Sequence, residues 1–178
     1  MELTATSATD IAIEYHDRGW SVIPVAPKQK RPLLAGWQNL RLDEQGIRRH
    51  FATTDKNIGV LLGEPSGWII DIDIDHPRAV QIAARCLPDT VMFGRRSSRR
   101  SHYIYSVTGS IKTKRFTSPL GTIIEIRSSG CQTVFPGSTH ESGEAVEWDL
   151  DGEPATITPD ELMDRVQHIF DLTTNKKD

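Results

Sequence analysis

The sequence has few cysteines and no long hydrophobic stretch. Its two cysteines, Cys86 and Cys131, are far apart, and neither belongs to a Cys-x-x-Cys pair. This excludes a disulfide framework and a zinc finger or ribbon. No run approaches the roughly 18 apolar residues that indicate a membrane-spanning helix. The N-terminus lacks the basic start and the apolar run of a signal peptide. We therefore expect a cytoplasmic protein that binds no zinc.

Acidic residues are missing from one long segment. Between Asp89 and Glu125 lie 35 residues with seven bases and no acid, whereas the remaining 143 residues carry 14 bases and 24 acids. The seven bases are Arg95, Arg96, Arg99, Arg100, Lys112, Lys114 and Arg115. Such a block attracts polyanions, although charge runs are also common on solvated surfaces. Because it lies between two acidic motifs, it indicates an active site that handles phosphates.

Length and periodicity predict one α+β domain. A chain of 178 residues, 37% hydrophobic and 25% charged, is typical of a folded domain. We expect a single domain over residues 1–178, with its core at about 8–172 and a polar C-terminal tail. Helices are predicted over 7–18, 43–51 and 77–86 and from Thr158, where Thr158 and Glu161 form a capping box. Strands are predicted over 20–25, 57–62, 68–74, 90–95, 101–107, 122–127, 132–135 and 144–148.

The sharpest motif is the run IIDIDIDH over residues 69–76. In a strand its isoleucines share one face, and Asp71, Asp73 and Asp75 share the other. Carboxylates on one face repel one another, so a divalent cation such as Mg²⁺ or Mn²⁺ is the natural partner. An EF-hand is excluded because His76 stands where that loop needs glycine. Two alternatives remain open, a solvated edge strand and the metal site of a sugar-nucleotide transferase.

A second acidic strand follows the basic segment. In the run IIEIR over residues 123–127, Glu125 and Arg127 share a face. If this strand neighbours the first, Glu125 can join Asp71 and Asp73 around one or two metal ions. Taken alone, an acid in a strand is more often a surface residue.

Candidate phosphate-binding groups precede and follow this second acid. A turn rich in serine and arginine precedes His102, and arginine matches phosphate oxygens in a bidentate manner. The later run PGSTH over 136–140 presents hydroxyl groups and the imidazole of His140.

The order of these motifs resembles the primase–polymerase domain of the archaeo-eukaryotic primase superfamily. It is most similar to the N-terminal module of bifunctional DNA primase/polymerase proteins found on plasmids, phages and integrated elements. The order is Asp-x-Asp, a Ser/Arg turn ending in His102, an acidic strand, and then Pro-x-Ser-x-His. The early residues Gly19, Trp20, Lys30, Pro32 and Trp37 also agree, and the resemblance covers about residues 8–150. Two departures are Arg100, where the family usually has serine, and Glu125, where aspartate is commoner.

The resemblance implies a fold and a set of site residues. The fold would be α+β, with a mixed or antiparallel central sheet flanked by helices, an RRM-like catalytic half and an N-terminal αβ half. The catalytic acids and ligands of two Mg²⁺ or Mn²⁺ ions would be Asp71, Asp73 and Glu125. The nucleotide-binding residues would be Arg100, Ser101, His102, Arg127, Ser138 and His140. The nucleic-acid-binding residues would be Arg95, Arg96, Arg99, Lys112, Lys114 and Arg115.

The function so implied is template-dependent nucleotidyl transfer in DNA replication, in which (d)NTPs are joined to a 3′-hydroxyl. Template and primer DNA and (d)NTPs would be the partners, with a helicase domain or protein as a further candidate. A metal-dependent nuclease is an alternative because it needs the same carboxylates, although its common signature has lysine where this sequence has Arg127. A non-catalytic module that binds single-stranded nucleic acid is the third reading.

Overall fold

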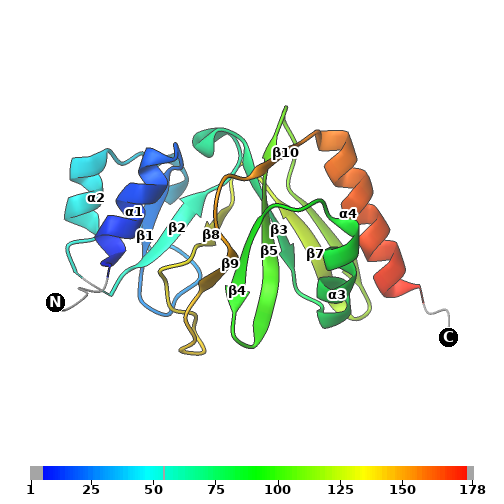
Figure 1. The fold of residues 1–178 in the computed structure, drawn as a ribbon. Coiled ribbons are helices and arrows are strands. Elements are labelled where there is room, and N and C mark those ends of the chain that lie inside the picture. Colours follow the sequence, from blue (N-terminus) through cyan, green and yellow to red (C-terminus); the bar gives the residue numbers. More distant parts are fainter. Residues whose placement is uncertain (1–5, 54, 176–178) are drawn as a thin grey trace.

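Two β-sheets and four α-helices make up the part of the chain that the structure describes (Figure 1). The structure is a computed structural model that describes residues 6–53 and 55–175. Two short 3₁₀ helices, η1 (Trp37–Asn39) and η2 (Glu64–Ser66), lie in connecting segments. Within these ranges no helix is long and apolar enough to cross a membrane. The class is α+β, as the sequence predicts.

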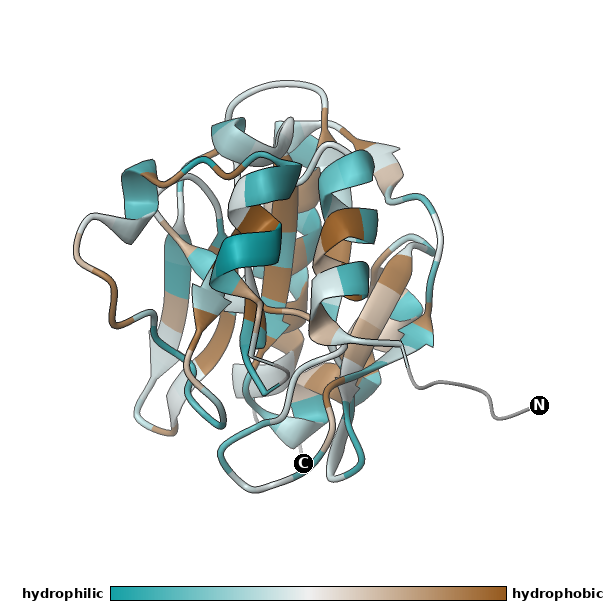
Figure 2. Ribbon diagram, turned by 90° about the vertical axis from the view of Figure 1, so that its left-hand side faces the viewer, coloured by the Kyte–Doolittle hydropathy of each residue, from teal (hydrophilic) through white to brown (hydrophobic). Residues whose placement is uncertain are grey.

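A small antiparallel sheet carries the N-terminal helices. It consists of β1 (Val22–Val25), β2 (Asn57–Leu61) and β8 (Gln132–Val134), in the order β1-β2-β8. The helices are α1 (Ala8–Asp17), capped by the Ser7 side chain, and α2 (Glu44–His50), capped by that of Asp43. Both lie in front of hydrophobic strands in Figure 2. Ala12 of α1 and Ile47 of α2 are fully buried in the core that they share with β1 and β2.

A seven-stranded sheet forms the rest of the molecule. Six of its strands follow the order β6-β7-β3-β5-β4-β9, and β10 pairs in parallel with β5. Their bounds are β3 (Ile69–Ile74), β4 (Val91–Arg95), β5 (Ser98–Val107), β6 (Lys114–Ser118), β7 (Gly121–Arg127), β9 (Glu147–Leu150) and β10 (Ala155–Ile157). The other neighbouring pairs of this sheet are antiparallel.

Each face of the large sheet belongs to a different core. Helices α3 (Pro77–Cys86) and α4 (Pro159–Thr174) share one core with Ile70, Ile72 and Ile74 of β3. On the opposite face, Phe93 and Ile104 join the core of the small sheet. Because strand side chains alternate, the aspartates of β3 lie on this second face, where the two sheets meet.

Most predicted elements are confirmed. The strand predicted over 144–148 is displaced to β9 at Glu147–Leu150, and there are three further differences. The strands β6 and β10 were not predicted from the sequence. The Ser/Arg turn is shorter than expected, because β4 and β5 keep pairing until Arg95 stands opposite Ser98. At the start of α4, the Thr158 hydroxyl accepts a hydrogen bond from the Glu161 amide as predicted, but the Glu161 carboxylate binds Arg165 instead of completing the capping box.

Candidate active site

The acidic strand β3 lies in the middle of the large sheet, between β5 and β7. The register places Asp73 opposite His102 of β5 and opposite Glu125 of β7. Residues that pair across strands point to the same face of a sheet, so these three side chains share one face. Asp71 on the same face is fully buried. A solvated edge strand is therefore the wrong interpretation, because β3 is hydrogen-bonded on both sides and Asp71 is shielded from water.

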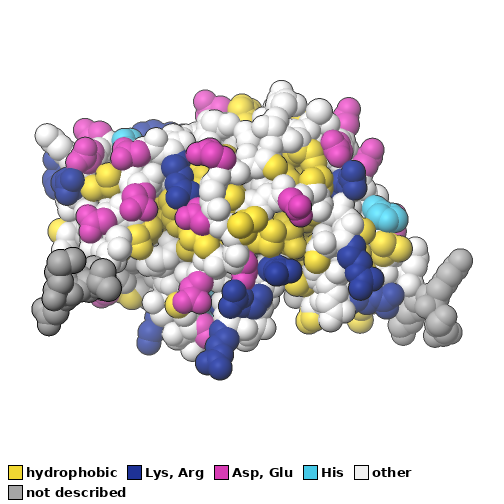
Figure 3. Space-filling view, in the orientation of Figure 1, with side chains coloured by type: hydrophobic (Ala, Val, Ile, Leu, Met, Phe, Trp, Pro, Cys, Tyr) yellow, Lys and Arg dark blue, Asp and Glu magenta, His cyan; other side chains and the backbone are white. Residues whose placement is uncertain are grey.

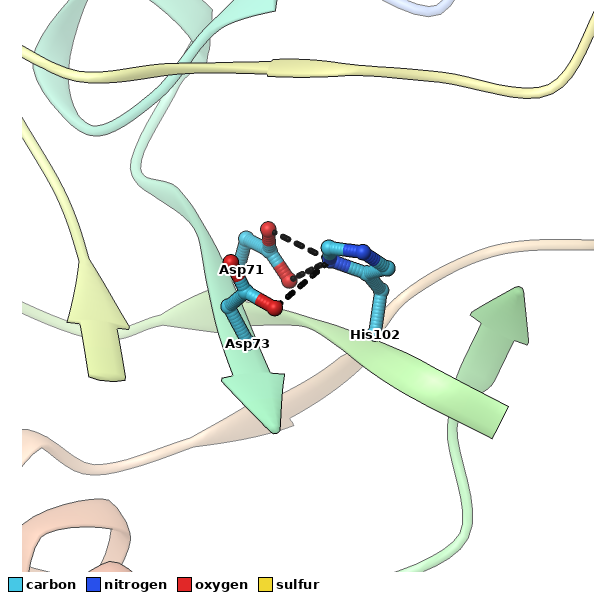
Figure 4. Close-up of side chains that lie close together, drawn as sticks. All are labelled: Asp71, Asp73 and His102. Carbon is cyan, nitrogen blue, oxygen red and sulfur yellow. Dashed lines mark hydrogen bonds and ion pairs between the residues drawn. The ribbon is translucent and has the colours of Figure 1, made fainter. Parts of the chain in front are cut away.

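Three side chains converge on Asp71 and Asp73. The His102 Nδ1 lies 3.0 Å from Oδ2 of Asp71 and 3.7 Å from Oδ1 of Asp73, as Figure 4 shows. The Thr133 hydroxyl of β8 donates a hydrogen bond of 2.6 Å to Asp71, which links the small sheet to the acidic strand. Arg127 of β7 approaches Asp73 at 3.5 Å. Ligand atoms of Asp71, Asp73 and His102 all lie within 4.8 Å of one another, close enough to hold one divalent cation.

Cations of the chain itself compensate the buried acids. Burial alone would lower the pKa of His102, but the charges of Asp71 and Asp73 and the hydrogen bond to Asp71 raise it to about 9. Burial opposes the charge of Arg127 as well, and the acids around it nevertheless raise its pKa. Burial and the charges of Asp73 and Glu125 raise the pKa of Asp75 to about 6. The site is therefore strongly electronegative, and a cation beside the carboxylates stabilises it.

Glu125 has a different partner. Its carboxylate accepts a hydrogen bond from the Arg115 guanidinium of β6 at 3.3 Å, and the side chain is nearly buried. In the sequence analysis the role of Glu125 is conditional on its strand neighbouring the Asp-x-Asp strand, and the pairing of β3 with β7 meets this condition. The metal-holding group found among the described residues contains Asp71, Asp73 and His102 but not Glu125. Glu125 thus stands beside the group, held by a basic side chain.

A cleft of about 170 Å³ opens above these acids, between the two sheets. The side of the cleft that lies along the acidic strand is lined by Asp73, Asp75, His102 and Arg127. Its other lining residues are Gln29, Lys30, Ile74, Gly94, Arg95, Ser98, Ser101, Gln132, Thr133, Val134, Thr139, His140 and Val146. Sequence reasoning gave no role to Lys30 or Thr133. Lys30 was quoted only within the resemblance, and nothing local marks Thr133, which reaches the site from the other sheet.

The β4–β5 hairpin holds much of the predicted basic cluster. Arg95 lines the cleft and pairs with Glu144 at 3.2 Å, and Arg99 pairs with Asp149. Arg96 is exposed at the hairpin turn. Arg100 is exposed, has a positive φ of 53° and is not among the cleft-lining residues. Figure 3 shows the molecule from the same side as Figure 1. At the lower edge of this view, Lys and Arg side chains with acids among them surround the tip of the hairpin.

The remaining predicted nucleotide-binding residues differ in position. Ser101 and His140 line the cleft, and the buried Nε2 of His140 has no hydrogen-bond partner among the described residues. Ser138 is buried, and its hydroxyl accepts a hydrogen bond from the Ile58 amide at 2.8 Å. Ser138 is not a cleft-lining residue. The structure therefore gives Ser138 a contact between segments of the fold, and brings His140 to the site.

The basic residues around β6 point in different directions. Lys114 lies over the Phe116 ring, 4.5 Å from its centroid, and approaches Met163 of α4. Arg115 next to it lies on the opposite face, beside Glu125. Lys112 is exposed before the strand begins. Of the three, only Arg115 contacts a side chain of the acidic site.

Most of the chain matches a known protein family. Residues 12–161 match the model for the N-terminal domain of bifunctional DNA primase/polymerase. The chain belongs to this family. The matched part of this primase/polymerase domain includes the acids, His102, Arg127 and the whole cleft lining. The sequence matches none of the curated proteins with which it was compared.

The residues present fit the divalent metal that a primase/polymerase domain implies. Two carboxylates supply the hard oxygen atoms that Mg²⁺ and Mn²⁺ prefer, and an imidazole is also acceptable to Mn²⁺. The imidazole of His102 lies 3.0 Å from the fully buried Asp71, and the charge of this carboxylate raises the pKa of His102, so the position favours positive charge. Asp71, Asp73 and His102 could therefore hold a divalent ion in this domain.

Proposed function

We propose that this domain is a template-dependent nucleotidyltransferase, a DNA primase/polymerase that joins (d)NTPs to a 3′-hydroxyl. The observation that carries the proposal is the Asp71–Asp73–His102 group, of which Asp73 and His102 line a cleft, in a chain of the primase/polymerase family. The cleft has an acidic side for metal and basic side chains for phosphates. This combination suits phosphoryl transfer, in which positioning and charge compensation supply most of the catalysis.

In this proposal Asp71 and Asp73 are the main metal ligands, and Glu125 completes the set from the neighbouring strand. Two Mg²⁺ or Mn²⁺ ions held there would activate the 3′-hydroxyl and neutralise charge on the departing pyrophosphate. Thr133 orients the buried Asp71 carboxylate through its hydrogen bond to Oδ2. Arg115 holds the Glu125 side chain near the site.

The triphosphate of the nucleotide would lie against the basic side of the cleft. Nδ1 of His102 faces the two acids, so Nε2 is the ring nitrogen that remains for a phosphate oxygen (Figure 4). Arg127 and His140 also line the cleft, and each has a buried nitrogen atom, Nε of Arg127 and Nε2 of His140, that has no hydrogen-bond partner in the described part of the chain. Such atoms are costly unless a ligand or water satisfies them. Ser101 lies beside them as a further candidate.

Template and primer would follow the exposed basic side chains outside the cleft. We assign Arg96, Arg100, Lys112 and Arg115 to this role, because all four are exposed and belong to the acid-free segment. Contacts of this kind bind the phosphate backbone and read little sequence. We also propose that residues 8–172 form one catalytic domain, in which the large sheet with α3 and α4 is the RRM-like half and the small sheet with α1 and α2 is the N-terminal αβ half.

Nucleotide incorporation on a primed template tests this function. The protein is incubated with a labelled primer–template and with each nucleotide set, NTP or dNTP, and with Mg²⁺ or Mn²⁺. We expect extension of the primer by the nucleotide complementary to the template. Shortening of the labelled strand would identify a nuclease instead. Binding of single strands with neither extension nor shortening would identify a non-catalytic module.

A further inference from the structure

Two buried carboxamides fix the loop that follows β1. The Asn57 side-chain amide donates hydrogen bonds to the carbonyl groups of Gln29 and Thr139, at 3.2 and 2.7 Å. Its oxygen accepts a hydrogen bond from the Thr139 amide at 2.9 Å. The Gln132 amide donates to the Lys30 carbonyl at 2.7 Å. Asn57 is only 2% exposed and Gln132 only 5%. These bonds join the Lys30 loop to the segment before His140 and hold both at the cleft.

A carboxylate lies close to the side chains of Lys30 and His140 at this rim. The Lys30 ammonium lies 2.9 Å from Oε1 of Glu141, and Nε2 of His140 lies 4.0 Å from the same oxygen. Lys30 and His140 line the cleft, whereas Glu141 does not. The hydrogen bond from Lys30, and then its charge, lower the pKa of Glu141. The Glu141 carboxylate is thus paired with Lys30 and lies at the limit of ion-pair distance from His140.

Glu144 on the same turn differs from Glu141. Its carboxylate accepts hydrogen bonds from the Ser97 amide, the Ser97 hydroxyl and the Ser142 hydroxyl, at 2.7, 2.8 and 2.8 Å, besides its ion pair with Arg95. Glu144 is thus tied to the β4–β5 hairpin. Among the described residues Glu141 has one close partner, Lys30, and both side chains of this ion pair are more than half exposed. Exposed pairs of this type contribute little to stability and exchange readily.

We propose that Lys30 is a binding residue for the triphosphate of the incoming nucleotide, and that Glu141 holds its ammonium group in the nucleotide-free protein. This inference rests on the proposed function. When a nucleotide enters, a terminal phosphate replaces the Glu141 carboxylate beside Lys30 and His140. A triphosphate carries several negative charges and the carboxylate one, so the exchange favours the phosphate. The carboxamides of Asn57 and Gln132 keep the backbone of Lys30 in place while its side chain changes partner.

Removing each partner of the pair should change nucleotide affinity in opposite directions. Lys30→Met should raise the KM for the nucleotide by about tenfold or more, the effect expected for a lost charge-assisted hydrogen bond. Glu141→Gln should lower KM by about two- to fivefold, because it removes the competing exposed ion pair. In the double variant Lys30→Met/Glu141→Gln, the KM should equal that of Lys30→Met alone. Lys28→Met is the matched control, since Lys28 is exposed on the same loop but does not line the cleft.

Inorganic tripolyphosphate shows whether the contact is to phosphate. Its affinity is measured by calorimetry with Mg²⁺ and also as inhibition of primer extension. Lys30→Met should weaken the binding of tripolyphosphate by about the same factor as the binding of the nucleotide, because both ligands lose one charge-assisted contact. A structural role for Lys30 would instead lower the melting temperature and leave both affinities unchanged.

The outcomes separate this inference from the proposed function. If the wild-type protein extends primers and Lys30→Met has the wild-type KM, the inference is wrong and the polymerase function stands. If the wild-type protein binds tripolyphosphate without extending primers, and Lys30→Met weakens that binding, the polymerase function is wrong and the Lys30 site stands. If the wild-type protein neither extends primers nor binds tripolyphosphate, both are wrong. If Glu141→Gln lowers the KM even in the Lys30→Met variant, Glu141 does not act through Lys30, and the proposed replacement of its carboxylate by a phosphate is wrong.

Discussion

Asp73 and Glu125 stand opposite each other on adjacent strands, yet the Glu125 carboxylate is bound by Arg115 from a third strand. His102 occupies the corresponding place opposite Asp73 on the other neighbouring strand. The antiparallel register thus places an acid and a histidine on the two sides of the Asp-x-Asp motif. Four strands of the large sheet thus supply these residues, and the geometry of the site depends on the register of that sheet as much as on any single motif.

The hydrogen bond from Thr133 to Asp71 should be important for stability. Thr133→Val keeps the shape of the side chain but leaves the buried Asp71 carboxylate with one donor fewer. We expect the free energy of unfolding of the metal-free protein to fall by about 1–3 kcal/mol, the cost of an unsatisfied buried polar group. Urea denaturation measures the change, with Thr117→Val, at an exposed threonine of β6, as the control. Equal stability of both variants would mean that the bond between the sheets contributes nothing.

The ionisation of His102 should depend on the acids beside it. Burial lowers its pKa, but Asp71 and Asp73 raise it to about 9, above the ordinary value of 6.5. The stability that this charge contributes is therefore fully present below about pH 6.5 and is lost as the pH rises through 9. NMR titration of the metal-free protein measures the pKa, and the signal missing from His102→Ala assigns it. We expect Mg²⁺ to lower this pKa, because the ion competes with the imidazolium for the same carboxylates. A pKa of 6.5 or lower without metal would exclude the charged pair.

The neighbours Lys114 and Arg115 should differ in their contribution to DNA binding. Arg115 faces the acidic site and its side chain is 61% exposed, whereas Lys114 lies over Phe116 toward α4. Arg115→Ala should lower the slope of log affinity against log salt by about 0.7 for a single strand, the loss of one phosphate contact. Lys114→Ala should leave the slope unchanged. Fluorescence anisotropy with labelled single strands over a range of KCl concentrations measures both slopes. If Lys114→Ala lowers the slope and Arg115→Ala does not, the DNA lies on the face of the sheet that α3 and α4 cover.

The sequence predicted those features that depend on local pattern. Alternation in the 69–74 run placed the isoleucines and aspartates on opposite faces, and the order of the motifs identified the family before the fold was known. Short strands with mixed composition, such as β6 and β10, were not predicted because their pattern is too brief to distinguish from a loop. Their partners in the sheet stabilise them, and local propensity does not reveal partners distant in the sequence.

Contacts between distant segments explain what the sequence did not reveal about the site. Thr133 lies 62 residues from Asp71 in the chain, and Lys30 reaches the cleft through bonds to Asn57 and Gln132. No spacing rule relates these positions. Ser138 is the opposite case. It lies in a turn that resembles a functional motif, but its hydroxyl accepts a hydrogen bond from the Ile58 amide of β2. The sequence also could not show that Arg95 and Arg99 have acidic partners, because those acids lie on a later strand and turn.

Primer extension by Asp73→Asn tests the central claim most directly. The substitution removes one negative charge and preserves the size of the side chain, and it reduces repulsion within the acidic cluster, so the fold should remain. The account predicts that the wild-type protein and the control Asp17→Asn, at an exposed acid of α1, extend the primer. Asp73→Asn, with an unchanged melting temperature, should extend it about 100-fold more slowly or not at all, because metal-dependent charge stabilisation contributes several kcal/mol. A folded Asp73→Asn protein that extends the primer at the wild-type rate would contradict the account.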